Sequence, residues 1–156
     1  LEAWNQGLVD AVACYQPTAS RLENAGAVPL FDSSQMPETI FDVLVVTEKA
    51  VQEQPAAIAG LVRGHFLGLQ HLVRNMHDAV YRIATRQEIT PDAVFDAMAT
   101  VMLPELTANR RYLAPGGRLD IIARRLGNIL LREGLIEQMP DIANLCTRDF
   151  LPGSLM

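Results

Sequence analysis

Apolar residues in the first third of the chain form short continuous runs, a pattern typical of strands that are covered on both faces. Three such runs predict strands at residues 8–13, 27–31 and 40–46. Between the first two runs, Pro17 and Gly26 bracket a predicted short helix, because proline suits the first turn of a helix and glycine suits its end. This part of the chain therefore predicts an α/β arrangement.

From Thr47 onward the apolar spacing changes to three and four residues, which places these side chains on one face of a helix. Thr47 is expected to cap a short helix over residues 48–53, and Pro55 is expected to begin a longer one. Loops are expected around Pro104 and over residues 114–117. Further helices are expected over residues 78–87, after Thr90-Pro91-Asp92, and over residues 118–133.

The predicted sheet is incomplete. Three strands are too few for a parallel sheet that lies between two helix-rich layers. The chain also opens with Leu1-Glu2-Ala3-Trp4-Asn5-Gln6-Gly7, which is typical of the last turns of a helix that a glycine ends. Both features predict a piece of a longer protein, and the isolated fragment is expected to self-associate through its exposed sheet edge.

Composition narrows the classes of partner. The chain has 156 residues, with 13 Lys and Arg against 18 Asp and Glu, which gives a net charge of -5. This balance argues against a nucleic acid or anionic membrane partner, because both demand clustered cations. No stretch predicts a transmembrane helix or a signal peptide. Cys14 and Cys146 are too few for a disulfide scaffold and lack the spacing of a zinc site.

The reactive side chains form no recognisable catalytic set. His65, His71 and His77 are six residues apart, so each turns by roughly 240° around a helix and the three cannot share a metal ion. His65 falls on an apolar stripe and is expected in the core. Cys14 could pair with a histidine as a nucleophile, but a single cysteine after an apolar strand is more often a small buried hydrophobe. The only lysine, Lys49, has no neighbour that would activate it. Neither catalysis, a metal nor a cofactor is expected.

The segment from Val12 to Thr18 is the best candidate for a ligand site. It joins the end of the first predicted strand to the start of the next helix, and ligands of open α/β sheets bind there. The helix N-terminus would favour an anion or a polar head group. An ordinary strand-to-helix connection, with Tyr15 covering the sheet, is the alternative. Candidate ligand-binding residues in this segment are Cys14, Tyr15 for stacking, Gln16 for its amide, and Thr18.

Several short motifs follow one another in a recognisable order. They are Gly7-x-Val9-Asp10-Ala11, Tyr15-Gln16-Pro17, Leu30-Phe31-Asp32-Ser33 and Asp42-Val43-Leu44-Val45-Val46, with Pro55 soon after. This order resembles the nitrate/sulfonate/taurine-type substrate-binding proteins of ABC importers, which share a fold with thiamine-pyrimidine-precursor proteins. The likeness covers nearly the whole chain, and it adds Asp10 as a ligand contact or a turn residue.

The resemblance implies an α/β, periplasmic-binding-protein-like (type II) fold, of which only the C-terminal portion with a helix-rich second half is present. Residues 1–40 would then belong to the second lobe. Residues 41–47 would be the return hinge strand, and residues 48–156 would be a helical segment that completes the first lobe.

The same resemblance implies a solute-binding component of an ABC importer that performs no catalysis. Its ligand would be a small polar organic molecule or an oxyanion (sulfonate, nitrate or pyrimidine-like), held between two lobes. An ABC permease would be its partner, and the protein would be periplasmic or a cell-surface lipoprotein. Family members carry Glu where this chain has Gln16, which leaves the charge of the ligand open. The alternatives are a ligand-sensing or interaction module of a signalling protein and, less favoured, an enzyme of pyrimidine synthesis.

Overall fold

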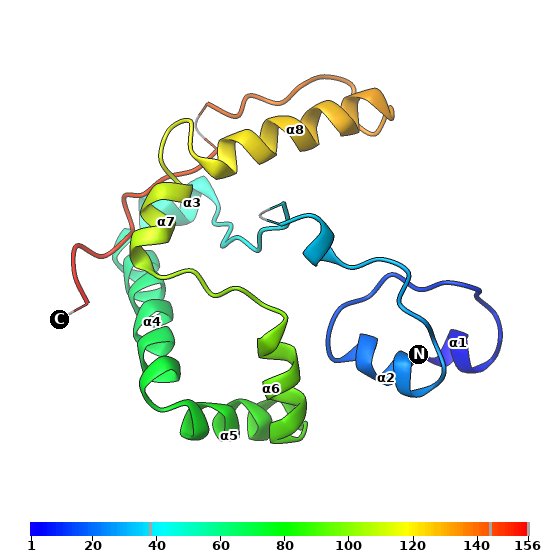
Figure 1. Cartoon of the computed structure of the whole chain (residues 1–156). Helices are drawn as coiled ribbons and strands as arrows, with labels where there is room; N and C mark the ends of the chain where they lie inside the picture. Colours follow the sequence, from blue (N-terminus) through cyan, green and yellow to red (C-terminus); the bar gives the residue numbers. More distant parts are fainter. Residues whose placement is uncertain (38, 144, 156) are drawn as a thin grey trace. The chain divides into compact units, whose positions relative to one another are not determined.

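The computed structural model describes residues 1–37, 39–143 and 145–155, and every regular element in them is helical. Figure 1 shows helices joined by irregular segments and no strand among these residues. The expectation of an α/β, periplasmic-binding-protein-like fold is therefore wrong. None of the helices in the described residues is long and apolar enough to cross a bilayer.

The chain divides into two compact units, and each contains two separate stretches of sequence. The first unit comprises Leu1–Pro37 and Asn75–Met102, and the second comprises Glu38–Arg74 and Leu103–Met156. Because the chain leaves the first unit and returns to it, residues far apart in the sequence meet inside that unit. This connectivity matters for the candidate site described below.

The first unit is built on the helical pair α5 and α6. Its elements are α1 (Glu2–Asn5), α2 (Thr18–Asn24), the 3-10 turn η1 (Ser33–Gln35), α5 (Met76–Gln87) and α6 (Pro91–Ala99). Helix α6 begins as the sequence predicts, since the Thr90 hydroxyl accepts a hydrogen bond from the Ala93 N–H over 3.2 Å and Pro91 follows the cap. The small core consists of Val80, Ala84 and Val94, with Ile89 and Met98 packed against it.

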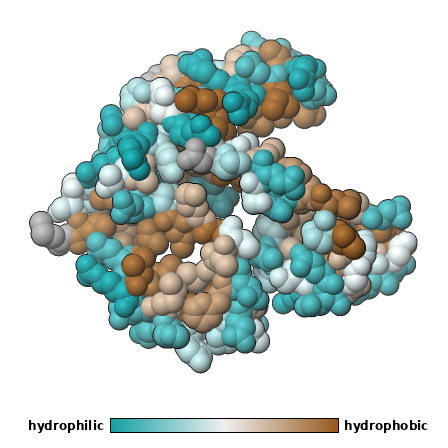
Figure 2. Space-filling model, in the orientation of Figure 1, coloured by the Kyte–Doolittle hydropathy of each residue, from teal (hydrophilic) through white to brown (hydrophobic). Residues whose placement is uncertain are grey.

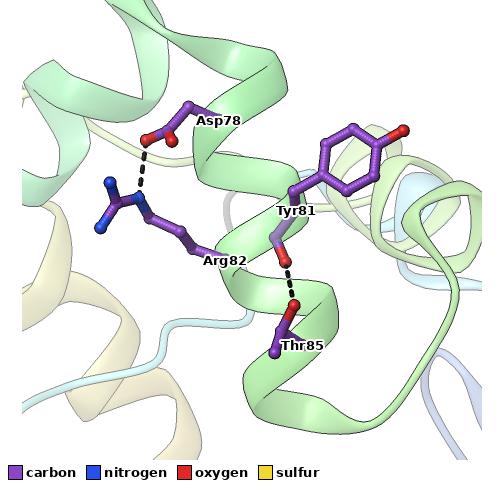
Figure 3. A network of polar contacts seen from close by, with 4 residues as sticks. All are labelled: Asp78, Tyr81, Arg82 and Thr85. Atoms are coloured by element: carbon purple, nitrogen blue, oxygen red, sulfur yellow. Dashed lines mark hydrogen bonds and ion pairs between the residues drawn. The ribbon is translucent and has the colours of Figure 1, made fainter.

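The outer face of α5 is polar and is held by contacts one helical turn apart. Figure 3 shows that the Arg82 Nε donates to Asp78 Oδ2 over 2.7 Å, and that the Thr85 hydroxyl donates to the Tyr81 carbonyl over 2.8 Å. This pairing raises the pKa of the Arg82 guanidinium, through its hydrogen bond and the charge of Asp78. Such exposed pairs stabilise a helix by only a few tenths of a kcal/mol, so the buried core between α5 and α6 contributes more to the pairing of these helices.

The second unit contains α3 (Glu48–Glu53), α4 (Pro55–Arg74), α7 (Leu106–Tyr112) and α8 (Arg118–Arg132). Thr47 caps α3 as predicted, because its hydroxyl accepts from the Ala50 N–H over 3.1 Å. Helix α3 packs on α4, and α7 packs on α8. At the α7–α8 turn an added side chain on Gly117 would lie 2.6 Å from the Ala114 carbonyl oxygen, so this close approach requires glycine.

Contacts between residues far apart in the sequence attach two irregular segments of the second unit to its helices. The Arg110 Nη2 donates to the carbonyls of Pro152 and Gly153 over 2.6 and 2.8 Å, and Arg63 donates to the Ser154 carbonyl over 3.3 Å. The rings of Phe41 and Tyr112 meet edge to face with their centroids 5.5 Å apart. These contacts attach irregular chain to α4 and α7 mainly through backbone carbonyls.

The three predicted strands are all irregular. Residues 8–13, 27–31 and 40–46 contain no strand, so the return hinge strand expected at residues 41–47 is not formed. Most of their apolar side chains are exposed to solvent: Leu8 is 70% exposed, Leu30 86% and Val45 81%. A strand needs a neighbour that supplies backbone donors and acceptors, and none of the described residues supplies one. Without that neighbour, apolar sequence alone does not produce a sheet.

Candidate functional site

A hollow of about 470 Å³ in the first unit is the best candidate for a ligand site. Its volume falls within the 300–1,000 Å³ typical of sites for small molecules. One wall comes from α2 and the residues just before it, and the other comes from the α5–α6 turn and the first turns of α6. The lining residues are Gln16, Pro17, Ser20, Arg21, Asn24, Glu88, Ile89, Thr90, Asp92, Ala93 and Asp96.

Gln16 is fixed in this wall by the start of α2. Its Oε1 accepts hydrogen bonds from the Ser20 hydroxyl over 2.8 Å and from the Ser20 N–H over 3.3 Å. These bonds assign the oxygen of the amide and leave Nε2 as a donor that has no partner among the described residues. The side chain is half-buried and lines the hollow, so its amide nitrogen is a candidate donor for a ligand bound there.

The lining carries more negative than positive charge. Glu88, Asp92 and Asp96 contribute three carboxylates, and Arg21 contributes one guanidinium. Within the described part of the chain, none of the four forms an ion pair. Two like charges about 4 Å apart repel by about 1 kcal/mol in bulk water and by about 4 kcal/mol near a protein surface. The hollow therefore favours a neutral or cationic ligand over an oxyanion.

The predicted ligand-binding residues separate into two groups. Gln16 lines the hollow, and Thr18 lies beside it as the half-buried first residue of α2. Asp10, Cys14 and Tyr15 are exposed and do not line it, and Tyr15 is 86% exposed. The structure therefore brings one predicted residue into the hollow, and it places the proposed stacking wall of Tyr15 in solvent.

The sequence analysis did not identify the carboxylates of the hollow as candidate site residues. Asp92 and Asp96 lie four residues apart on α6, so one helical face presents both. The spacing of these two aspartates can be seen in the sequence. Their proximity to Gln16 cannot be predicted from it, because about 70 residues separate the two walls of the hollow and only tertiary packing joins them.

A second hollow, of about 180 Å³, lies in the second unit beside Cys146 and Asp120. This volume is smaller than a typical small-molecule site. Burial, and then the negative charge of Asp120, raise the pKa of the Cys146 thiol. Because the thiolate is the nucleophilic form, these surroundings make Cys146 a poor nucleophile at neutral pH.

The remaining reactive side chains are solvent-facing. His65 is exposed beside the Phe66 ring, so its expected place in the core is wrong. His71 and His77 are also exposed. In residues 1–37, 39–143 and 145–155, no group of three His, Cys, Asp or Glu residues could hold a metal ion. Lys49 lies at the surface, 4.0 Å from the Glu53 carboxylate.

Comparison of the chain with models of protein families, with curated proteins and with solved structures finds no match in any of the three.

Proposed function

We propose that this protein is a non-catalytic binding protein for a small polar organic molecule, and that it serves as the solute-binding component of an ABC importer. One observation carries the proposal: Gln16, from the segment that resembles such binding proteins, lines a hollow of suitable size and has an amide Nε2 with no partner among the described residues. The proposal depends on this side chain and its neighbours, and it does not require an α/β sheet.

The ligand class follows from the lining. Gln16 supplies a donor, and the carboxylates of Asp92 and Asp96 supply acceptors for N–H groups. Pro17, Ile89 and Ala93 supply a small apolar surface for the body of the ligand. A pyrimidine-like heterocycle or an organic amine satisfies this set. Sulfonates and nitrate fit less well, because they would bring a negative charge close to carboxylates.

The importer role and its location come from the resemblance alone. A solute-binding component carries its ligand outside the cytoplasmic membrane and passes it to a permease, so we place the protein in the periplasm or at the cell surface as a lipoprotein. The partner would be an ABC permease. Reversible binding without chemical change is the only activity that this role requires.

Isothermal titration calorimetry of the full chain tests the proposal with four probes: an aminopyrimidine, a primary amine, methanesulfonate and nitrate. We expect binding of the aminopyrimidine or the amine and weaker or no binding of the two anionic groups. Saturable binding of none of the four would overturn the proposal.

The decisive variant is Gln16→Glu. It keeps an oxygen for the Ser20 hydroxyl but replaces the Nε2 donor with a second oxygen, so α2 keeps its contact while the ligand loses one. We expect the affinity for the neutral aminopyrimidine to fall at least about fivefold, because an unmet hydrogen bond at a polar site costs about 1–3 kcal/mol. Gln52→Glu, on the exposed face of α3, is the matched control and should bind normally. An unchanged affinity of the Gln16→Glu variant for the aminopyrimidine would show that Gln16 does not contact the ligand.

A further inference from the structure

The two walls of the ligand hollow carry opposite charges. We call them the α2 wall and the α6 wall, after the helices that supply most of their residues. The α2 wall consists of Gln16, Pro17, Ser20, Arg21 and Asn24. The α6 wall consists of Glu88, Ile89, Thr90, Asp92, Ala93 and Asp96. Among the described residues that line the hollow, all three carboxylates therefore belong to the α6 wall, and the one guanidinium belongs to the α2 wall.

Helix geometry separates the two kinds of charge. Residues 17, 20, 21 and 24 are spaced by three, one and three, so one face of α2 and its N-cap presents them. Asp92 and Asp96 share a face of α6 in the same way. Figure 2 shows hydrophilic surface over α2. Each wall thus offers polar groups from a helical face of its own.

The charged side chains of the two walls stay unpaired. Those of Arg21, Glu88, Asp92 and Asp96 form no ion pair with any described residue. All four residues are exposed, so water solvates their charges in the free protein. Opposite charges that line one hollow attract each other, yet here they do not meet, because each is held on its own helix. A bound molecule that bears both kinds of charge can contact both walls.

This arrangement ranks the classes of charged ligand. A simple anion such as nitrate would meet Arg21 but would be repelled by three carboxylates. A simple amine would meet the carboxylates but would leave Arg21 without a counterion. A zwitterion satisfies both walls when its anion faces α2 and its cation faces α6. Gln16 adds to this polarity, because its Nε2 donor belongs to the same wall as Arg21 and suits a carboxylate.

The number of charges narrows the class further. Three carboxylates against one guanidinium give the lining a net charge of -2. A ligand with one carboxylate and two cationic groups complements this balance better than a zwitterion with one of each. Pro17, Ile89 and Ala93 offer apolar contact to the alkyl chain that would join these groups. An amino acid with a cationic side chain has this composition.

We propose that the ligand of the hollow is an amino acid with a cationic side chain. Its carboxylate contacts Arg21 and the Gln16 Nε2, and its two cationic groups contact carboxylates of the α6 wall. This inference rests on the proposed function and narrows the organic amines considered there to one chemical class. The hollow of about 470 Å³ is large enough for such a molecule.

Isothermal titration calorimetry of the full chain at low salt tests the inference with three matched probes. Lysine carries all three charged groups, whereas lysinamide has a neutral amide in place of the carboxylate. Norleucine keeps the zwitterion and the alkyl chain but lacks the side-chain ammonium. Norleucine should bind at least about threefold more weakly than lysine, because it loses one ion pair with exposed carboxylates. Low salt is chosen because it limits the screening of exposed charges.

Arg21→Gln is the decisive variant, and lysinamide is its internal control. The variant should weaken lysine binding about fivefold, which is the upper range for an ion pair between exposed groups. It should leave lysinamide binding no weaker, because lysinamide has no carboxylate for Arg21 to contact. Asp92→Asn with Asp96→Asn should weaken both ligands, since both carry the cationic groups. Arg124→Gln removes the same charge in the second unit and should bind lysine normally.

Different results separate the failure of this inference from the failure of the proposed function. Equal losses of lysine and lysinamide affinity in Arg21→Gln would exclude the carboxylate contact, and equal binding of lysine and norleucine would exclude the second cation. Binding of the aminopyrimidine or of a simple primary amine, without binding of lysine, would overturn this inference and leave the proposed function standing. Saturable binding of none of the probes in either set would overturn both.

Discussion

Three glycines on α4 provide a sharp test of how this helix is packed. Gly60, Gly64 and Gly68 are four residues apart, so they form a stripe along one side of the helix. A Cβ added at any of the three would have no heavy atom within 4 Å apart from its chain neighbours and the backbone of its own helix. The buried side chains of α4 are Ile58, Phe66 and Leu72, which lie off this stripe. We therefore expect alanine at these positions to stabilise the protein.

The magnitude follows from helix propensity. Glycine in a helix interior is about 0.5–1 kcal/mol less favourable than alanine, because its backbone loses more freedom on folding. Since no contact opposes the added methyl groups, the three gains together should total about 2 kcal/mol. For a unit of about 90 residues, each kcal/mol raises Tm by about 4–8 °C. Gly60→Ala, Gly64→Ala and Gly68→Ala together should raise Tm by about 10 °C.

The measurement is thermal and urea unfolding followed by circular dichroism, for the three single variants and the triple variant. Ala59→Gly, on an exposed position of the same helix, is the reverse control and should lose what each glycine replacement gains. Gly153→Ala lies in an irregular segment and has open space, so it should change little.

A loss of stability in any single glycine variant would refute this reasoning. It would mean that the glycine stripe touches a surface which the described residues do not provide, because a methyl group costs free energy only where something already occupies its place. A gain at one position and a loss at another would locate that contact along α4.

Val80→Ala should lower the free energy of unfolding by about 2 kcal/mol, because it removes two methyl groups from a fully buried side chain. Val73→Ala, on a side chain that is 72% exposed, should stay within about 0.5 kcal/mol; equal costs in urea unfolding would contradict the α5–α6 core. Thr90→Ala should cost about 1 kcal/mol in the same assay through loss of the α6 cap, whereas Thr90→Ser keeps the hydroxyl, and an equal cost for both would exclude the cap. Iodoacetamide at pH about 8 should alkylate exposed Cys14 before Cys146, because burial raises the pKa of the Cys146 thiol and the thiolate reacts. Peptide mass spectrometry measures both rates, which should converge as pH rises, and equal rates at pH about 8 would refute the assignment.

The helices with strong local signals could be predicted from the sequence. The caps at Thr47 and Thr90 act on amides only three residues away, so the residues that decide these helix starts are adjacent in the sequence. Gly134 follows the C-cap of α8 and has a positive φ of 69°, which agrees with the glycine stop that the sequence predicts at this end of the helix. Helix α7 was not predicted, because its seven residues lie between two expected loops and show no clear apolar stripe.

The strands could not be decided by the same local reasoning. A continuous apolar run such as residues 40–46 fits a buried strand, but a strand also needs a partner elsewhere in the chain or in another chain. Hydropathy carries no information about that partner. In the structure the backbone of this run is irregular and Leu44 and Val45 are exposed, while Phe41 packs on the Tyr112 ring.

The candidate site shows why its ligand class was harder to predict than its location. Gln16 could be identified from its place before a helix, and it does line the hollow. The sign of the charge opposite Gln16 comes from Asp92 and Asp96, which reach it only because the chain returns to the first unit after α4. A helix N-terminus considered alone favours an anion. Two carboxylates across the same hollow reverse that preference, since each full charge exceeds the half charge of a helix end. The ligand's charge is therefore a property of the tertiary contact, and residues 12–18 do not decide it by themselves.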